Sequence, residues 1–381
     1  DMITANETGP DAGRYLFSPY ETDTAGVKRY DLQTGNSLTV VAEGTQGFVG
    51  GDASYWTPWG SYLTAEEEWG GANTKGRLFE LTNSTTTAGP ATSDFVWRDI
   101  VPRVSHEGMA FDKNNHLYFI DELNGGSIYK YVSANPDAPD GNGYFDAGQT
   151  FAMLVNGGGN ANATGAITWA AITDPNGAAL AGVSALNADG TIDGRVSANN
   201  VSATDYQRPE DMQIQTLSNG DQILYAATTT TDEVYSFNLG TDTAKLFASQ
   251  ASLDQATNLS VGGVFNNPDN LAMDAENNLY IVEDQPGGEA DIWFAKDENR
   301  DGVAESIGRW ASMSTIGAEP TGLYFDKFDS NIAYVNVQHA ASDIDRMIQV
   351  SAVPEAETYA MMLAGLGLMG AVVRRRKRLS K

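Results

Sequence analysis

The residues that could do chemistry gather first in the stretch QRPED, from Gln207 to Asp211. Arg208 stands two residues before Glu210, across a proline, and Asp211 follows directly. One cation is thus set against two carboxylates within four residues. Such crowding is typical either of a solvated surface or of a site, and the acids elsewhere in the chain distinguish the two.

Acids occupy a similar place in four repeated segments of the sequence. Glu107, Glu210 and Asp269 each precede by five residues the polar residue that ends a strand-like stretch. Glu319 precedes Asp326 by seven residues, so its position is close but shifted. The four acids therefore belong to equivalent parts of one repeating unit.

The repeating unit reads as a short antiparallel sheet. The segments HEGMAFDKNNHLYFIDELNGGSIYKY, from His106, and PDNLAMDAENNLYIVEDQPGGEADIWF, from Pro268, follow one plan. Each has an acid, apolar residues alternating with period two, an Asn-rich turn, a second strand, a Gly-Gly turn and a third strand. The segments from Pro209 and Gly317 follow the same plan, and the one from Tyr15 resembles its outer strands.

Short antiparallel units repeated with insertions are typical of a β-propeller. We therefore predict an all-β fold, a six-bladed propeller that occupies residues 1–352. The Gly-, Ala- and Asn-rich stretch 156–200 does not fit the plan and is predicted to be a long excursion between blades. A single hydrophobic helix is predicted at the C-terminus, within a separate segment 353–381.

Equivalent positions in a propeller lie at equivalent radii, so the four acids are expected to converge in the central channel. Carboxylates that meet away from water cannot all stay ionised unless protons or cations compensate them. Several hard oxygen ligands suit Ca²⁺ or a trivalent iron. The alternative is that each acid caps a turn within its own blade.

A second, peripheral cation site is possible in DENRDGVAE. Asp297, Asn299 and Asp301 stand at alternate positions and Gly302 follows, as in the first half of a calcium loop. Gly308 replaces the glutamate that such a loop has at its twelfth position. A polar hairpin tip is the equally acceptable interpretation.

The charge of the chain argues against nucleic acid as a partner. The net charge is −27, and residues 1–352 hold 17 Lys and Arg against 48 Asp and Glu. Such a surface repels phosphate backbones. The chain has no cysteine, which excludes disulfides, thiolate ligands and a thiol nucleophile.

The C-terminal stretch VPEAETYAMMLAGLGLMGAVVRRRKRLSK has a Pro-Glu pair, an uncharged run from Thr358 to Val373 and a basic cluster. This order resembles the PEP-CTERM sorting signal of Gram-negative bacteria, although Ala356 replaces its second proline. The resemblance implies transient membrane insertion through the C-terminal helix and recognition by an exosortase. Cleavage near Pro354 would then release the protein to the cell envelope, the extracellular matrix or the medium.

The body resembles the PhoX-type alkaline phosphatases, which are calcium-dependent bacterial exoenzymes on a six-bladed propeller. The matching pieces are TPWGSYLTAEE, SHEGMAFD, QRPED, NNPDNLAMD and GAEPTGLYFD, in the family's order. The family builds an iron and calcium cluster from carboxylates at these places. Carried over, the candidate metal ligands are Glu66, Glu107, Glu210, Asp269 and Glu319.

The resemblance also makes Arg208 the guanidinium that would bind a substrate phosphate, so that Arg208 and Glu210 are the candidate catalytic residues. Within WGSYLTAEE only Glu66 is predicted to be in register for the channel. The family has an iron-binding cysteine where this chain has Ala65. Ca²⁺ is therefore the expected cofactor, and Fe³⁺ is left in doubt.

Two functions follow from these expectations. The first is a secreted, metal-dependent hydrolase of phosphomonoesters. The second is a non-catalytic propeller, stabilised by calcium, that acts as an extracellular surface or matrix binding module. The intact Arg208 and the five acids favour the first, whereas Ala65 favours the second.

Overall fold

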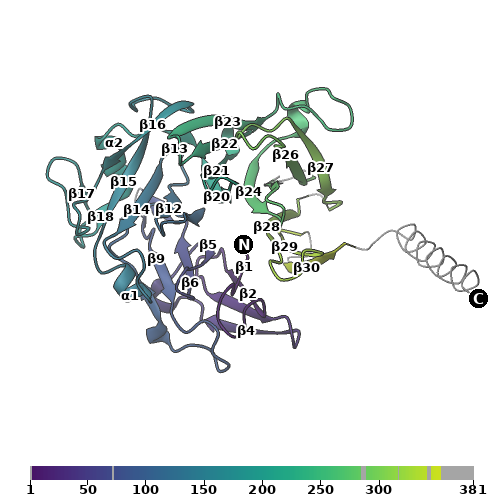
Figure 1. Cartoon of the computed structure of the whole chain (residues 1–381). Coiled ribbons are helices and arrows are strands. Elements are labelled where there is room, and N and C mark those ends of the chain that lie inside the picture. Colours follow the sequence, from purple (N-terminus) through teal and green to yellow (C-terminus); the bar gives the residue numbers. More distant parts are fainter. Residues whose placement is uncertain (1, 71–72, 285–288, 316, 341–344, 353–381) are drawn as a thin grey trace, which may run out of the picture.

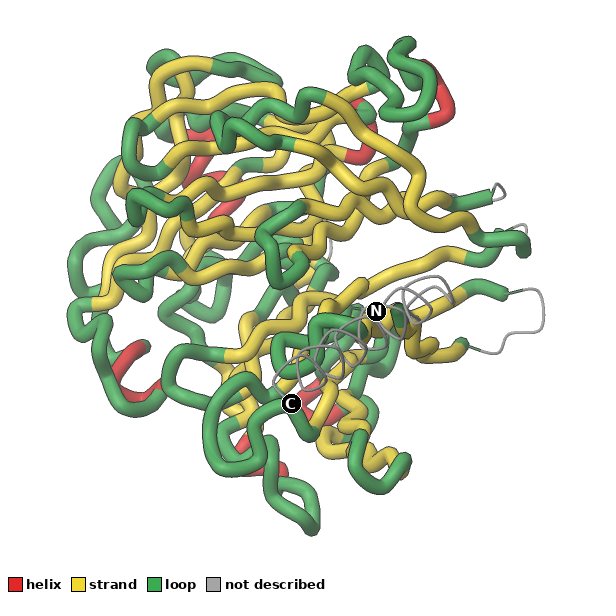
Figure 2. The backbone as a smooth tube through the Cα atoms, turned by 45° about the vertical axis from the view of Figure 1, so that its right-hand side comes forward, coloured by secondary structure: helices red, strands yellow, loops and turns green. Residues whose placement is uncertain are grey.

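A computed structural model describes residues 2–70, 73–284, 289–315, 317–340 and 345–352. Its regular secondary structure is almost entirely β, arranged as antiparallel sheets around a central axis (Figure 1). Helices are few and short, as the tube view makes clear (Figure 2). The predicted all-β propeller is confirmed. The predicted C-terminal hydrophobic helix, and the segment 353–381 that holds it, lie outside the described residues.

The strands form six successive meanders, which we call blades one to six. Blade one contains β1 (Thr4–Ala5), β2 (Tyr15–Pro19), β3 (Val27–Asp31) and β4 (Asn36–Val41). Blade two contains β5 (Gly51–Trp56), β6 (Tyr62–Glu66), β9 (Leu78–Leu81) and β10 (Phe95–Trp97). Blade three contains β11 (Met109–Phe111), β12 (Leu117–Ile120), β14 (Ile128–Ser133) and β15 (Gly148–Val155). Blade four contains β20 (Pro209–Thr216), β21 (Gln222–Thr228), β22 (Glu233–Asn238) and β23 (Thr243–Ser249).

Blade five contains β24 (Pro268–Met273), β25 (Leu279–Glu283), β26 (Asp291–Lys296) and β27 (Ser306–Ser312). Blade six contains β28 (Glu319–Phe325), β29 (Ile332–Gln338) and β30 (Arg346–Ser351). Three short pairs lie outside the blades: β7 (Trp69–Gly70) with β8 (Asn73–Thr74), β13 (Asn124–Gly126) with β19 (Tyr206–Gln207), and β17 (Ala185–Leu186) with β18 (Ile192–Asp193). The α-helices are α1 (Gly141–Tyr144) and α2 (Gly194–Asn200).

The excursion 156–200 joins two blades. Its strand β16 (Gly165–Ala171) pairs with β15 on one side and with β23 on the other. Blades three and four therefore form one sheet of nine strands. The rest of the excursion includes α2, which returns toward blade three.

The hydrophobic core lies between neighbouring blades. The described residues form six hydrophobic clusters, and each cluster combines side chains from two adjacent blades. In the sixth cluster, Ile3, Ala5 and Leu16, from the region of blade one, pack against Tyr324 and Tyr334 of blade six. The ring of blades is therefore closed by contacts between its first and last members.

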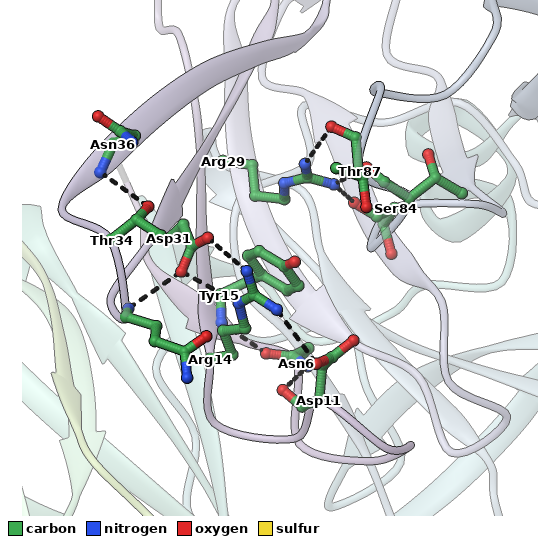
Figure 3. A network of polar contacts seen from close by, with 12 residues as sticks. Asn6, Asp11, Arg14, Tyr15, Arg29, Asp31, Thr34, Asn36, Ser84 and Thr87 are labelled. Atoms are coloured by element: carbon green, nitrogen blue, oxygen red, sulfur yellow. Dashed lines mark hydrogen bonds and ion pairs between the residues drawn. The ribbon is translucent and has the colours of Figure 1, made fainter.

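Polar contacts add to this packing between blades one and two (Figure 3). Within blade one, Arg14 donates from Nε and Nη2 to the two oxygens of Asp31, at 3.1 and 2.8 Å. Arg29, which is buried on β3, donates to the backbone carbonyl of Ser84 at 2.8 Å. Because Ser84 follows β9, this guanidinium links the two blades.

The turns follow from the polar residues between strands. Asp112 Oδ1 accepts the N–H groups of Asn114 and His116, at 2.8 and 2.9 Å, and so closes the β11–β12 turn. Asn115 adopts a positive φ of 58°, which asparagine tolerates better than most residues. The Asn-rich turn predicted for blade three is confirmed.

The innermost strands of blades two, four and five each begin with a β-bulge. In blades four and five the second bulged residue binds the next blade. Asp211 Oδ2 accepts the N–H of Leu271 at 2.9 Å, and Asn270 Oδ1 accepts the N–H of Gly322 at 2.7 Å. A bulge re-aims the side chains at the end of a strand. Here it leaves the first bulged residue free to turn toward the channel.

We expect Gly108→Ala to lower the free energy of unfolding by about 1–3 kcal/mol, the usual range for overpacking. A Cβ atom at Gly108 would lie 2.6 Å from the backbone oxygen of Glu210 and 2.6 Å from the nitrogen of Met212. Chemical denaturation measures the change. Gly263→Ala is the matched control, because nothing lies within 4 Å of its added Cβ. Equal stabilities of the two variants would contradict the close contact between Gly108 and the backbone of blade four.

Candidate metal centre

Three of the predicted carboxylates meet at the centre of the ring. Glu107 precedes β11, Glu210 lies on β20 and Asp269 lies on β24. Their ligand oxygens all lie within 4.8 Å of one another, and the three side chains are buried or nearly so. Glu210 and Asp269 are the first residues of the two bulges described above. Adjacent blades thus bring acids 162 residues apart into one group.

Burial and mutual repulsion act on the protonation of this group. Burial, followed by the charges of Glu210 and Asp269, raises the pKa of Glu107 well above its usual range. The pKa of Asp269 is raised well above its usual value by the same kind of causes. Neither oxygen of Glu210 has a well-formed hydrogen bond from the described residues. Oxygens that are buried together with so few donors suit a hard cation such as Ca²⁺.

Arg208 lies at the edge of the carboxylate group. Its Nε donates to Glu122 at 2.6 Å and lies 3.0 Å from Oε1 of Glu210. Among the described residues, Nη1 and Nη2 have no hydrogen-bond partner, and 38% of the side chain is exposed. The guanidinium is therefore oriented by two acids while its terminal nitrogens are open to a ligand.

The backbone at Arg208 is held in a strained conformation. Its φ is 56°, a value that residues with a Cβ rarely adopt. The N–H of Arg208 donates to Leu123 at 3.0 Å, and its carbonyl accepts the N–H of Thr229 at 3.0 Å. Leu123 directly precedes β13 and Thr229 directly follows β21, so these two bonds support the strained backbone and set the direction of the side chain.

Two acids that the sequence analysis did not single out join the neighbourhood of the group. Asp52, the first residue of the β5 bulge, is buried, and its Oδ1 has no hydrogen-bond partner among the described residues. Its pKa is raised well above the usual value by burial and then by Glu67. Glu122 contacts Arg208 and neighbours Glu67. The stretch GGDASYW held a signal for Asp52, because an acid there precedes an alternating strand, as in the other blades.

Glu66 does not join the carboxylates that meet in the channel. Its Oε1 and Oε2 accept from Nη2 and Nε of Arg77, at 2.5 and 2.8 Å, and the side chain is buried. Glu67 interacts instead with Glu122, Glu21 and Glu210. The prediction that only Glu66 is in register was wrong by one residue, since successive side chains of a strand point in opposite directions.

Glu319 lies near the group but outside its compact part. Its two oxygens are contacted by Gln338 at 3.3 Å and by His339 at 3.1 Å. Burial, and then the charge of Asp284, raise its pKa to about 7. Its bulge begins two residues later along the strand than in blade five, so that Gly322, and not an acid, takes the place corresponding to Asp269. The irregular spacing of Glu319 in the sequence has this cause.

The peripheral loop uses its acids to form a turn. Asp297 accepts the N–H groups of Asp301 and Gly302, at 3.2 and 3.1 Å, and Asn299 accepts that of Asp301 at 2.8 Å. Lys245 Nζ lies 3.5 Å from a carboxylate oxygen of Asp301. These contacts correspond to the polar hairpin tip, and calcium binding by this loop stays a prediction.

In the presence of EDTA, the free energy of unfolding is expected to fall as the pH rises from about 5 to 8. Burial, with the charge of Glu122, raises the pKa of Glu210 from 4.5 to about 7 in the folded chain. The folded state then binds more protons than the unfolded state in this interval. The contribution is complete below about pH 4.5 and is lost as the pH passes 7, which amounts to roughly 3 kcal/mol. Urea denaturation at several pH values measures it, and stability that rises with pH would contradict it.

The crystal structure of a structural genomics protein of unknown function from Bacteroides thetaiotaomicron is similar over 92% of this chain and 68% of that chain, with 12% identity and a TM-score of 0.47. The β-propeller domain of Cps50 (Swd1) from Myceliophteria thermophila is similar over 91% of this chain and 85% of that chain, with 9% identity and a TM-score of 0.39. No curated protein matches the sequence significantly.

Two family models match the sequence. The PEP-CTERM protein-sorting motif matches residues 352–377, which indicates export, sorting to the cell envelope or exterior of a Gram-negative bacterium, and processing by an exosortase. None of the helices in the described part of the chain has the length and apolar character needed to cross a membrane. The model for alkaline phosphatase PhoX matches residues 49–341, which include all the carboxylates of the channel named as candidate ligands. The chain therefore belongs to the PhoX alkaline phosphatase family.

Proposed function

We propose that this protein is a secreted, calcium-dependent hydrolase of phosphomonoesters. The observation that carries the proposal is the position of Arg208. Its two terminal nitrogens have no hydrogen-bond partner in the described part of the chain, and its Nε lies 3.0 Å from a carboxylate of the buried group. Phosphate has the charge and the paired oxygens that a guanidinium binds bidentately. A cation held by the carboxylates would add the positive charge that so acidic a site needs to accept phosphate.

Glu107, Glu210 and Asp269 would hold calcium, together with Glu319, Asp52 and Glu67. Bound calcium supplies Lewis-acid polarisation of a phosphoryl oxygen and lowers the pKa of bound water. Arg208 would bind the phosphoryl group and offset the negative charge that grows in the transition state. Glu122 would keep the guanidinium in that orientation through its contact with Nε.

Iron fits the described residues less well than calcium does. Ala65, which replaces the family's cysteine, is fully buried on β6 and offers no donor atom. Glu66 next to it is neutralised by Arg77. The donors of the compact group, Glu107, Glu210 and Asp269, are carboxylate oxygens, which are the ligands of a hard cation such as calcium.

The second candidate function is a non-catalytic, calcium-stabilised propeller that binds a surface or matrix component outside the cell. The same replacement of cysteine by Ala65 favours it. In this case the carboxylates would bind calcium tightly, and Arg208 would have no role in turnover. Cleavage near Pro354 and transient insertion of the C-terminal helix into the membrane belong to both proposals, because both concern an exported protein.

The test is to purify the full chain, measure its bound metals and assay phosphomonoester hydrolysis in calcium, in iron and in EDTA. The proposal expects calcium to bind and turnover to depend on calcium. Tight calcium binding with no turnover of any phosphomonoester would establish the second candidate. Turnover restored by iron alone would contradict the assignment of calcium.

A further inference from the structure

We propose that Arg195, on helix α2 of the excursion 156–200, is a positioning residue for the carboxylate group. It would act by fixing three separate segments that carry acids of the channel. This inference rests on the proposed binding of cations by these acids.

Arg195 makes a bidentate contact with a buried carboxylate. Its Nε and Nη2 donate to Oδ2 and Oδ1 of Asp121, each at 2.6 Å. No part of the Asp121 side chain is exposed, and 17% of the Arg195 side chain is. Paired, charge-assisted bonds of this kind fix direction as well as distance. The third nitrogen, Nη1, donates to the backbone oxygen of Trp69 at 3.2 Å.

Asp121 passes this contact on to the segment that carries Glu107. Its Oδ1 also accepts the N–H of Ser105, at 2.9 Å. The N–H of the next residue, Glu122, donates to the backbone oxygen of Ser105, also at 2.9 Å. Ser105 is thus held on both sides, two residues before Glu107.

The three segments held by Arg195 all lead to the channel. Trp69 follows Glu67 by two residues, Asp121 precedes Glu122, and Ser105 precedes Glu107. The connection extends through Glu122 to Arg208, whose Nε donates a hydrogen bond to the Glu122 carboxylate at 2.6 Å. A single, largely buried cation from outside the blade repeat, 17% exposed, therefore connects the acids of blades two and three with the candidate phosphate-binding residue.

The matched comparison is Arg103, whose side chain is 6% exposed and which contacts the same excursion. It donates to Thr191 Oγ1 at 2.9 Å and to the backbone oxygen of Lys75 at 2.8 Å, and it pairs with Asp189. Thr191 and Asp189 are not candidate ligands. Arg103→Met should therefore loosen the excursion without displacing the acids.

The experiment measures calcium affinity by isothermal titration calorimetry on the full chain, with Arg195→Met, Arg103→Met and Arg195→Lys compared with the natural sequence. Loss of a residue that orients metal ligands typically weakens metal binding 10–100-fold. We expect that loss for Arg195→Met, a change below threefold for Arg103→Met, and partial recovery for Arg195→Lys. In the phosphatase assay, Arg195→Met should raise the calcium concentration needed for half-maximal rate by a similar factor.

Arg195→Met leaves a buried carboxylate unpaired and could fail to fold. If Arg195→Met does not fold, the double variant Asp121→Asn, Arg195→Met is used in its place, because it removes both charges. The same loss of calcium affinity is expected. Equal calcium affinity in the Arg195 and Arg103 variants would overturn the positioning role while leaving the proposed function intact. Absence of calcium binding by the natural sequence would overturn the proposed function, and this inference with it.

Discussion

Replacing Arg208 by alanine is expected to lower kcat/KM for a phosphomonoester by roughly 10²–10³-fold, the loss found when one preorganised donor to a transition state is removed. Nη1 and Nη2 are the nitrogens available to a ligand, and Glu122 already orients them. Most of the loss should appear in kcat, because the negative charge that Arg208 offsets grows as the phosphoryl group is transferred.

Steady-state kinetics with a saturating calcium concentration measure this effect. Arg208→Lys should remain well below the natural rate, because an ammonium group cannot make paired bonds to phosphate. Arg309→Ala is the matched control, since Arg309 also pairs through Nε with a carboxylate, that of Asp291 at 2.7 Å, on another part of the surface. Equal rates for the Arg208 and Arg309 variants would show that Arg208 takes no part in turnover.

Calcium is expected to stabilise the protein by about 2.7 kcal/mol at a concentration one hundred times its dissociation constant. Glu210→Gln should lose most of this gain, because it removes one ligand from the compact group. In EDTA at pH 8 the same variant should be more stable than the natural sequence. The amide removes a negative charge from a buried group whose members repel one another, as the raised pKa values of Glu107 and Asp269 indicate.

The opposite signs in EDTA and in calcium separate a cation site from an ordinary buried acid. Glu298→Gln is the control, because it removes the same charge from an exposed position. The Glu298 side chain is 74% exposed and forms a surface ion pair with Lys296. Chemical denaturation of both variants in the two conditions provides the measurement. A Glu210→Gln variant that is destabilised in EDTA and still gains full stability from calcium would contradict the assignment.

Much of the propeller could be predicted because its signals are local. The period-two alternation and the Asn-rich turn at Asn115 each act within a few residues, and both hold in the structure. The excursion could not be predicted in the same way. Its strand β16 is fixed by partners in two different blades, and no local pattern identifies them.

The site was predictable only where its acids repeat in register. Glu107, Glu210 and Asp269 each stand five residues before the polar residue that ends their strand, and their side chains do meet. The sequence does not show whether Glu66 or Glu67 points toward the channel. Arg77, eleven residues later in the chain, pairs with Glu66 and so keeps that side chain out of the group. Asp52 escaped notice because its segment lacks the rest of the repeated plan, although its bulge matches those of blades four and five.

The seam between the first and last blades has a consequence for biosynthesis. A hydrogen bond there, from Asn336 Nδ2 to Ser18 Oγ at 3.1 Å, joins residues separated by 318 positions. Contacts so distant along a chain form only after almost all of it has been synthesised, and they slow folding. A ring that closes so late remains open during most of its synthesis, which suits a polypeptide destined for export.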